Sequence, residues 1–299
     1  MLSLTDLAAL AESHREDLLV DIAPLFIGSR EIDTAIRPAV MGCINLSRDS
    51  TYRESIAIST DAGVRMARVM SAQGADFVDI GAESSTARAV RVSAQDQIAR
   101  MIPVIERVSD EGIAVSVETY DVNVVRACLK AGAQVVNLTG TADQDAILEL
   151  AAEHGATVVL CYVAGDNVRD ITDVVTDTDP IPGLLEHFGA RVDLAHSRGV
   201  HRLVIDPGMG FYYGNLVEPV VRARHQASVL LQSFRLRALG QPVCNALPHA
   251  FDLFGDQFRT AEGFFAVLAA VGGTNVFRTH EVAHVRSVLD AIATLNGPK

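Results

Sequence analysis

The segment Leu203-Val204-Ile205-Asp206-Pro207-Gly208-Met209-Gly210-Phe211 decides the fold of this chain. Its first three residues form a short apolar run typical of a buried strand, and Asp206 places a carboxylate at the end of that strand. The two glycines that follow allow the backbone to approach a ligand closely. The segment therefore predicts a strand whose C-terminal end carries a ligand-binding group.

The same arrangement recurs along the chain. Eight short apolar segments each lead to a polar residue: 39–44 to Asn45, 77–81 to Glu83, 115–117 to Glu118, 135–136 to Asn137, 158–161 to Tyr162, 203–205 to Asp206, 243–244 to Asn245, and 275–277 to Arg278 and His280. Amphipathic stretches with a glycine near their end separate several of them, at residues 59–74, 121–132 and 143–155.

Alternating strands and helices predict a parallel sheet with right-handed crossovers. Eight such units predict a single (β/α)8 TIM barrel of the α/β class, in which polar residues at strand ends converge on one face. A doubly wound open sheet is the structural alternative. No Gly-x-Gly-x-x-Gly turn follows the first strand to support it.

Residues 1–38 precede the first predicted strand, and residues 39–299 are predicted to form the barrel domain. Leu4, Leu7, Leu10 and Leu18 indicate a helix, and an irregular or hairpin segment follows around residues 27–29. We expect this N-terminal extension to cap the bottom of the barrel. Basic residues do not precede an apolar core here, so the segment is not a signal peptide, and no run approaches the length of a membrane span.

Composition narrows the class of partner. The net charge of −12 and the pI of about 5.1 disfavour a nucleic-acid surface, which needs a basic stripe. An anionic small molecule would instead need a local cationic pocket. The four cysteines show no paired spacing, which indicates reduced buried thiols and a cytoplasmic location.

His280-Glu281-Val282-Ala283-His284 matches the His-Glu-x-x-His pattern of zinc proteases. That chemistry requires both histidines one turn apart on a helix. Here His280 follows a predicted strand, and the next helix is expected to begin near Glu281 or Val282. We therefore interpret His280 as a site residue at a strand end and His284 as a solvated helix residue.

Taken in order, the strand-end motifs resemble those of the dihydropteroate synthase family of pterin-binding TIM barrels, from about Ala39 to the C-terminus. The matching segments are residues 41–50 and 79–85 for the first two strands and their loops, 116–120, 131–133 and Asn137 for the third and fourth strands, 206–211 for the sixth strand, and 277–282 for the eighth.

In that family, a hydroxymethyl-dihydropterin diphosphate condenses with p-aminobenzoate and releases diphosphate. The resemblance implies that Arg278 and His280 are catalytic, because both donate hydrogen bonds to the leaving anion. It also implies that Asn45 ligates a Mg²⁺ ion carried by the diphosphate. Asp49, on the first loop, would stabilise the developing cation. Asp79 lies inside its strand and is interpreted as a buried structural carboxylate.

The resemblance also implies a set of substrate-binding residues. Asp206 and Asn137 can accept and donate hydrogen bonds to the amino-pyrimidine ring of a pterin. Glu83, Glu118 and His249 complete the set. Two of these residues also have a structural interpretation: Asn137 as the end of its strand and Asp206 as an Asx turn before Pro-Gly.

Departures from the family pattern concentrate at the aminobenzoate end. Glu118 replaces an aspartate, and its extra methylene displaces the carboxylate within a site that depends on position. Pro248-His249-Ala250 replaces the seventh-strand Ser-Arg-Lys motif, and His249 restores only part of the lost donor capacity. Other departures are Leu138 after the fourth-strand Asn, Arg48 and Thr51 in the first loop, Ser85-Thr86-Ala87 with Arg88 in the second, and Tyr212-Tyr213 after the sixth strand.

We therefore expect a dihydropteroate-synthase-like transferase that keeps the pterin diphosphate half of the site, with an arylamine such as p-aminobenzoate as the open second substrate. One alternative is a non-catalytic homologue that binds a pterin or phosphorylated ligand. Another is a pterin-dependent methyltransferase, for which Asn245 is the support. The resemblance also implies a homodimer through the last helices, where residues 281–295 are rich in Val and Leu. The apolar residues 229–234 either join that interface or cover the barrel.

Overall fold

The computed structural model describes residues 2–50, 52–85, 89–170, 173, 179–211, 213 and 215–297. Of the positions that depart from the family pattern, five lie outside the described residues: Thr51, Thr86, Ala87, Arg88 and Tyr212.

Eight parallel strands form the barrel that the sequence predicts. They are β3 (Ala39–Asn45), β4 (Phe77–Gly81), β5 (Val115–Thr119), β6 (Val135–Leu138), β7 (Thr157–Cys161), β8 (Leu203–Asp206), β9 (Cys244–Ala246) and β10 (Val276–Thr279). Their order in space is β8-β7-β6-β5-β4-β3-β10-β9. A parallel bridge between Ile205 and Val243 joins β8 to the segment before β9 and closes the barrel. The predicted (β/α)8 fold is confirmed.

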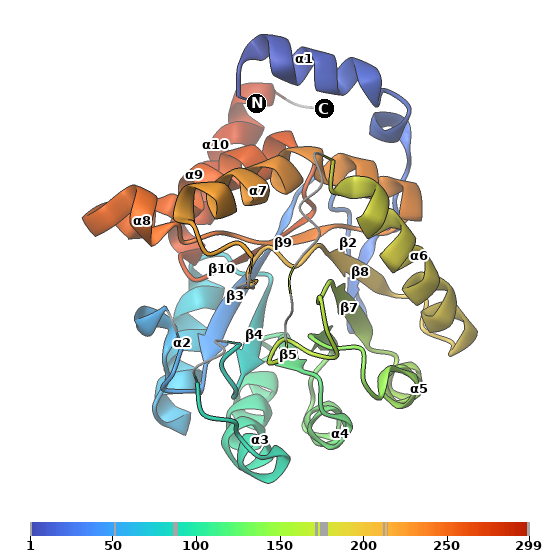
Figure 1. Ribbon diagram of the computed structural model, residues 1–299. Coiled ribbons are helices and arrows are strands. Elements are labelled where there is room, and N and C mark those ends of the chain that lie inside the picture. The colour runs from blue at the N-terminus through green and yellow to red at the C-terminus, as the bar shows by residue number, and fades with distance from the viewer. Residues whose placement is uncertain are drawn as a thin grey trace.

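Helices follow the strands and surround them (Figure 1). They are α2 (Thr60–Ala72), α3 (Ala94–Asp110), α4 (Val122–Lys130), α5 (Gln144–His154), α6 (Ile181–Ser197), α7 (Pro219–Gln232), α8 (Phe251–Phe254), α9 (Ala261–Val271) and α10 (Val282–Asn296), with 3-10 turns at Asp17–Leu19, Arg53–Ser55, Ser233–Leu239 and Gly255–Thr260.

The predicted helix starts are confirmed by capping contacts. Ser59 accepts a hydrogen bond from the Ala62 amide at the start of α2, and Asp121 accepts from Asn123 and Val124 at the start of α4. Gly155 ends α5 with a positive φ of 61°. Each of these signals was local, which is why the sequence alone located them.

The N-terminal extension closes the bottom of the barrel. It contains α1 (Leu4–Ser13) and an antiparallel hairpin of β1 (Leu25–Ile27) and β2 (Arg30–Ile32). Leu25 and Ile27 pack against Met41 and Phe77 near the N-terminal ends of the strands, inside the barrel. Below the strands, the buried carboxylate of Asp76 accepts hydrogen bonds from Arg30, Arg37 and Arg286 and from the Val40 amide.

The apolar residues of α10 are used within the chain. Val282, Val285 and Leu289 are buried against the barrel, so these three side chains do not face a partner, and the expected dimer through the last helices stays a prediction. The apolar residues of the 229–234 segment are likewise buried and cover the barrel. All four cysteines are free and buried, as predicted. Among the described residues, no helix is long and apolar enough to cross a membrane.

Candidate active site

The pleat of the strands decides which side chains reach the barrel mouth. In β8, Leu203 and Ile205 pack outward against helices, whereas Val204 packs inside the barrel. Asp206, two residues after Val204, therefore also points inward. The same alternation turns the polar residues of five strands into the barrel, and together they form a network that we call the floor: Asp79, Ser116, Glu118, Asn137, Asp206 and Arg278.

Asp79 holds the floor together. One carboxylate oxygen accepts from the Ser116 hydroxyl at 2.7 Å, and the other accepts from Asn137 at 2.9 Å and from Arg278 Nε at 2.8 Å. Asp79 is 1% exposed, so its charge depends on these donors in place of water. The prediction of a buried structural carboxylate is confirmed. Asn137 is more than a strand end, because it joins Asp79 to the thiol of Cys161.

Arg278 points down into the floor. Its guanidinium donates to Asp79 and also to Glu118, whose side chain lies beside it at the pocket surface. Burial raises the pKa of Glu118 and the charge of Arg278 opposes that rise. Arg278 and Glu118 form an ion pair at the pocket surface, and this pair separates the open pocket from the deeper side chains of Asn137 and Asp206.

Asp206 is buried in the floor and also forms a turn. Its Oδ1 accepts from the Gly208 amide at 2.8 Å, so the Asx turn and the buried position occur together. Gly208 has a φ of 79°, and a Cβ there would lie 2.5 Å from the Tyr162 carbonyl oxygen and the Tyr213 hydroxyl. Only glycine fits this position. Burial raises the pKa of Asp206 to about 6, while the Gly208 hydrogen bond and Arg278 oppose the rise.

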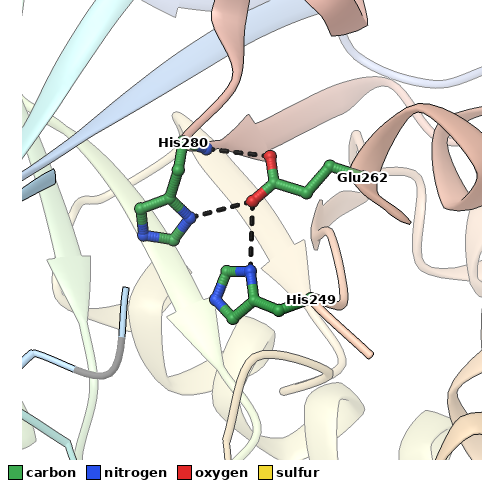
Figure 2. Close-up of side chains that lie close together, drawn as sticks. All are labelled: His249, Glu262 and His280. Carbon is green, nitrogen blue, oxygen red and sulfur yellow. Dashed lines mark hydrogen bonds and ion pairs between the residues drawn. The ribbon is translucent and has the colours of Figure 1, made fainter. Parts of the chain in front are cut away.

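Beside the floor lies a second cluster, which we call the rim: Tyr52, His249, Glu262 and His280. Glu262, at the start of α9, is fully buried and accepts from the His280 amide at 2.9 Å and from its Nδ1 at 3.0 Å (Figure 2). His249 Nδ1 lies 3.2 Å from the same carboxylate. Tyr52 stacks on the His280 ring, with centroids 4.5 Å apart, and donates to Glu281.

Glu262 and His280 of the rim both have lowered pKa values. Burial opposes the charge of Glu262, but the neighbouring imidazoles of His280 and His249 hold its pKa below the usual range. Burial also lowers the pKa of His280. The arrangement is therefore an ionised carboxylate that accepts from neutral imidazole, in which Nδ1 of His280 carries its proton toward Glu262.

A small pocket opens between the floor and the rim. Its cavity volume is about 70 Å³, and its lining includes Asn45, Glu83, Glu118, His249, Arg278 and His280. This is well below the roughly 300 Å³ of a typical ligand site. The structure thus brings six of the nine predicted site residues together at one pocket and places Asn137 and Asp206 beneath it.

Asp49 is the exception among the predicted residues. It lines a separate groove of about 710 Å³ between the first and second loops, and its carboxylate accepts from the Val90 amide. Glu83 does line the small pocket, where it accepts hydrogen bonds from the Val92 amide and the Tyr120 hydroxyl. Those two contacts tie the second loop to the end of β5.

The positions of three side chains decide two alternatives that the sequence left open, the zinc-protease pattern and the pterin-dependent methyltransferase. α10 begins at Val282, after His280, so the His-Glu-x-x-His histidines do not share a helix. His284 is not solvated as expected, because it packs closely on Gly263 of α9 and is half-buried. Asn245 donates to Ser233 and Thr274, which removes the support that it gave to the methyltransferase alternative.

Comparisons with known proteins agree with this geometry. The sequence profile of the family described as "Pterin binding enzyme" matches residues 41–280. The chain belongs to the pterin-binding enzyme family. It is 31% identical over 284 residues to the dihydropteroate synthase of Synechocystis sp., covering 90% of this chain and 95% of that one.

Solved structures of a dihydropteroate synthase are also similar to this chain over nearly its whole length. The dihydropteroate synthase of Xanthomonas albilineans with 4-aminobenzoic acid is 27% identical, with a TM-score of 0.77 over 93% of this chain and 100% of that one. The complex of the same enzyme with 7,8-dihydropteroate has a TM-score of 0.75 at 26% identity, again covering 93% of this chain and 100% of that one.

Asn45 suits the Mg²⁺ role that the pterin-binding family implies. Its Nδ2 donates to the Ser55 hydroxyl at 2.6 Å, which leaves Oδ1 on the other side of the amide, and the residue lines the pocket. Mg²⁺ prefers oxygen ligands and is commonly held by one or two protein groups together with substrate phosphates and water. One oriented amide oxygen beside an anion pocket fits that pattern.

Sequence reasoning missed Glu262 and Tyr52. Glu262 is the one charged residue in the otherwise apolar segment 261–271, and that isolated charge was the available signal. Tyr52 gave no such signal, since an aromatic residue in a polar loop is common. Its packing on His249 and His280 depends on loops that are distant in sequence.

Proposed function

We propose that this chain is a dihydropteroate-synthase-like transferase that binds a pterin diphosphate at the barrel mouth. The observation that carries the proposal is the inward set of Asn45, Asn137, Asp206, Arg278 and His280, which converges from the ends of four strands on one pocket and its floor. The family match and the relatives described above support the same class of activity.

In this proposal, Asp206 and Asn137 hold the amino-pyrimidine ring of the pterin from below. A carboxylate and an amide match its donors and acceptors. The ring needs space that the Arg278–Glu118 pair now occupies, so Arg278 must turn from Glu118 toward the substrate anion. The pair thus acts as a cover over the deeper part of the floor.

The leaving diphosphate would lie between Arg278 and the outward nitrogen of His280. The bond between the pterin methylene carbon and the diphosphate oxygen breaks, a carbon–nitrogen bond to the arylamine forms, and the amine loses a proton to solvent. Donors placed around the departing charge lower the barrier. A Mg²⁺ ion on Asn45, when bound, would neutralise part of the diphosphate charge.

The second substrate is proposed to be an arylamine of the p-aminobenzoate type. The related Xanthomonas structure carries 4-aminobenzoic acid. Here the rim offers His249 and Tyr52 in place of the Ser-Arg-Lys pattern. Asp49 reaches the reacting carbon in this proposal only if the first loop carries it from its groove to the barrel mouth.

We further propose a homodimer. Beside the three buried residues of α10, exposed apolar side chains lie on α7, α8, α9 and the end of α10: Val220, Val221, Leu253, Phe264, Val267, Val271 and Leu295. A Phe264→Glu variant should then elute as a monomer by light scattering at a concentration where the wild-type chain is dimeric. A wild-type chain that is monomeric at all concentrations would contradict this proposal.

Calorimetric titration with hydroxymethyl-dihydropterin diphosphate and Mg²⁺ tests the main proposal. We expect micromolar binding, weakened roughly 100-fold in Asp206→Asn, because a buried charged hydrogen bond is lost. Glu118→Asp shortens the covering side chain and should tighten binding several-fold. The absence of binding by both the wild-type chain and Glu118→Asp would overturn the proposal.

The non-catalytic alternative is favoured by one observation, the small pocket closed by Arg278 and Glu118. Diphosphate release measured with and without p-aminobenzoate separates the two functions. Sustained release that depends on the amine supports the transferase. Binding without release, over a range of arylamines, would support the binding protein.

A further inference from the structure

The three titratable side chains of the rim come from different segments and meet at one point. His249 follows β9, Glu262 begins α9, and His280 follows β10 (Figure 2). Glu262 Oε1 lies 3.0 Å from Nδ1 of His280 and 3.2 Å from Nδ1 of His249. One ligand atom from each of the three residues lies within 4.8 Å of the others.

The hydrogen bonds of Glu262 leave one oxygen for the imidazoles. Its Oε2 accepts from the Thr279 hydroxyl and from the backbone amides of His280 and Glu281. Its Oε1 faces the two Nδ1 atoms. The Nδ1 atom of His249 is buried and close to Oε1, yet it is not aligned for a hydrogen bond with it.

A proton shared between His280 and Glu262 explains half of this geometry, but it leaves the buried Nδ1 of His249 without an aligned hydrogen bond. A cation between the three atoms would satisfy all of them. Bond lengths of about 2.0–2.2 Å in a tetrahedral site place neighbouring nitrogen and oxygen ligands about 3.3 Å apart. The two observed nitrogen–oxygen separations of 3.0 and 3.2 Å are close to that value, and the third separation, between the two histidines, is bounded by the 4.8 Å limit given above.

We propose that His249, Glu262 and His280 bind a divalent transition-metal ion, with Zn²⁺ as the preferred occupant. Two imidazoles and one carboxylate are a ligand set suited to Zn²⁺, whereas Mg²⁺ favours oxygen ligands and is expected at Asn45 instead. Three protein ligands leave a fourth position for water or a pocket ligand. The site shares His249 and His280 with the proposed transferase site, but it follows from the geometry of the three side chains and not from that function.

Such an ion would change the electrostatics of the rim. It would place positive charge beside Pro248-His249-Ala250, the segment in which the family pattern has an arginine and a lysine. The coordinating nitrogen of His280 is Nδ1, so its other nitrogen stays available to an anion in the pocket. The metal site and the anion site can therefore be occupied together.

Zn²⁺ titration of the full chain, stripped with a chelator and monitored by competition with a chromophoric chelator, tests the proposal. The wild-type chain should bind one equivalent, and His249→Ala and Glu262→Gln should each weaken that site by roughly 100-fold or more. Co²⁺ in place of Zn²⁺ should give the intense visible bands of four-coordinate cobalt in the wild-type chain but not in His249→Ala or Glu262→Gln.

His284→Ala is the matched control, because it removes the second histidine of the His-Glu-x-x-His pattern and should leave affinity unchanged. Circular dichroism verifies that each variant is folded. If Glu262→Gln does not fold, His249→Ala by itself still tests the site, because the His249 side chain is partly exposed. Failure of the wild-type chain to bind one equivalent would overturn the proposal. Equal affinity in wild type and His249→Ala would also overturn it and indicate surface histidines such as His196 and His201.

Discussion

The floor and the rim of the barrel mouth lie side by side but are built in different ways. In the floor, side chains of adjacent strands meet because the strand register places them at the same level along the barrel. Asp79 of β4 and Ser116 of β5 are register partners, and their side chains are hydrogen-bonded. In the rim, Glu262 and Tyr52 arrive from a helix start and a loop. The direction of a side chain in a strand can therefore be predicted from the sequence, whereas contacts between loops that are distant in the sequence cannot.

The two regions also balance charge differently. The floor holds three carboxylates, Asp79, Glu118 and Asp206, around the single guanidinium of Arg278. The rim holds one carboxylate between two imidazoles. An excess of buried carboxylates makes the floor sensitive to pH and to the loss of any donor. The rim instead brings two imidazoles to one carboxylate, a ligand set that suits a metal ion.

The largest expected effect is on the floor. Asp79→Ala removes the acceptor of Ser116, Asn137 and Arg278 and should lower the free energy of unfolding by about 3–5 kcal/mol, because three buried donors, one of them charged, lose the carboxylate that they share. Urea denaturation measures the change. Glu111→Ala, which breaks the exposed pair with Arg68, is the control and should have little effect. A fall in the free energy of unfolding no larger than that of Glu111→Ala would mean that the floor does not depend on Asp79.

The second effect concerns pH. The pKa of Asp206 is raised to about 6 in the folded chain, so the folded state binds more protons than the unfolded state between about pH 4 and pH 6. The free energy of unfolding should therefore fall by about 2–3 kcal/mol as pH rises through this window. In Asp206→Asn this contribution should vanish. Parallel pH–stability curves for the two proteins would argue against a buried, proton-binding Asp206.

A third prediction tests Mg²⁺ at the pocket between the two regions. If Asn45 ligates the ion, Asn45→Ala should weaken pterin diphosphate binding about tenfold with Mg²⁺ present, or about 1.4 kcal/mol. Without Mg²⁺, the variant and the wild-type chain should bind equally. Calorimetry with and without a chelator makes the measurement, and an equal loss in both conditions would assign Asn45 a role apart from the ion.

The smallest expected effect is on the rim. Tyr52→Phe keeps the ring stacked on His280 and removes the hydrogen bond from its hydroxyl to Glu281. We expect the free energy of unfolding to fall by about 1 kcal/mol, since one partly buried hydrogen bond is lost. Thermal unfolding measures it. A loss as large as that of Asp79→Ala would mean that the rim supports the fold as strongly as the floor.

Much of the site could be predicted because each strand carries its own signal. Asn45, Glu118, Asn137, Asp206 and Arg278 each sit at or near the end of an apolar run, and parallel strands bring those ends to one face. The hydrophobic pattern thus determined the fold and the membership of the pocket. It did not determine how the side chains would pair once they arrived there.

Tertiary structure alone decided those pairings. The sequence suggested Arg278 as an anion-binding group, but in the folded chain it is held by Asp79 and Glu118. Asp49 shares a loop with other site residues and yet lines another groove. Such contacts depend on side-chain directions and loop paths, which no local pattern encodes.

The sequence by itself therefore determined the (β/α)8 barrel, the strand ends that bear polar groups and the family to which the chain belongs. Periodicity and capping are local, and they act through residues that are close in the chain. Only the tertiary structure decided that Glu262 would meet His249 and His280. These residues are held by separate elements, and their meeting follows from how α9 packs beside β10.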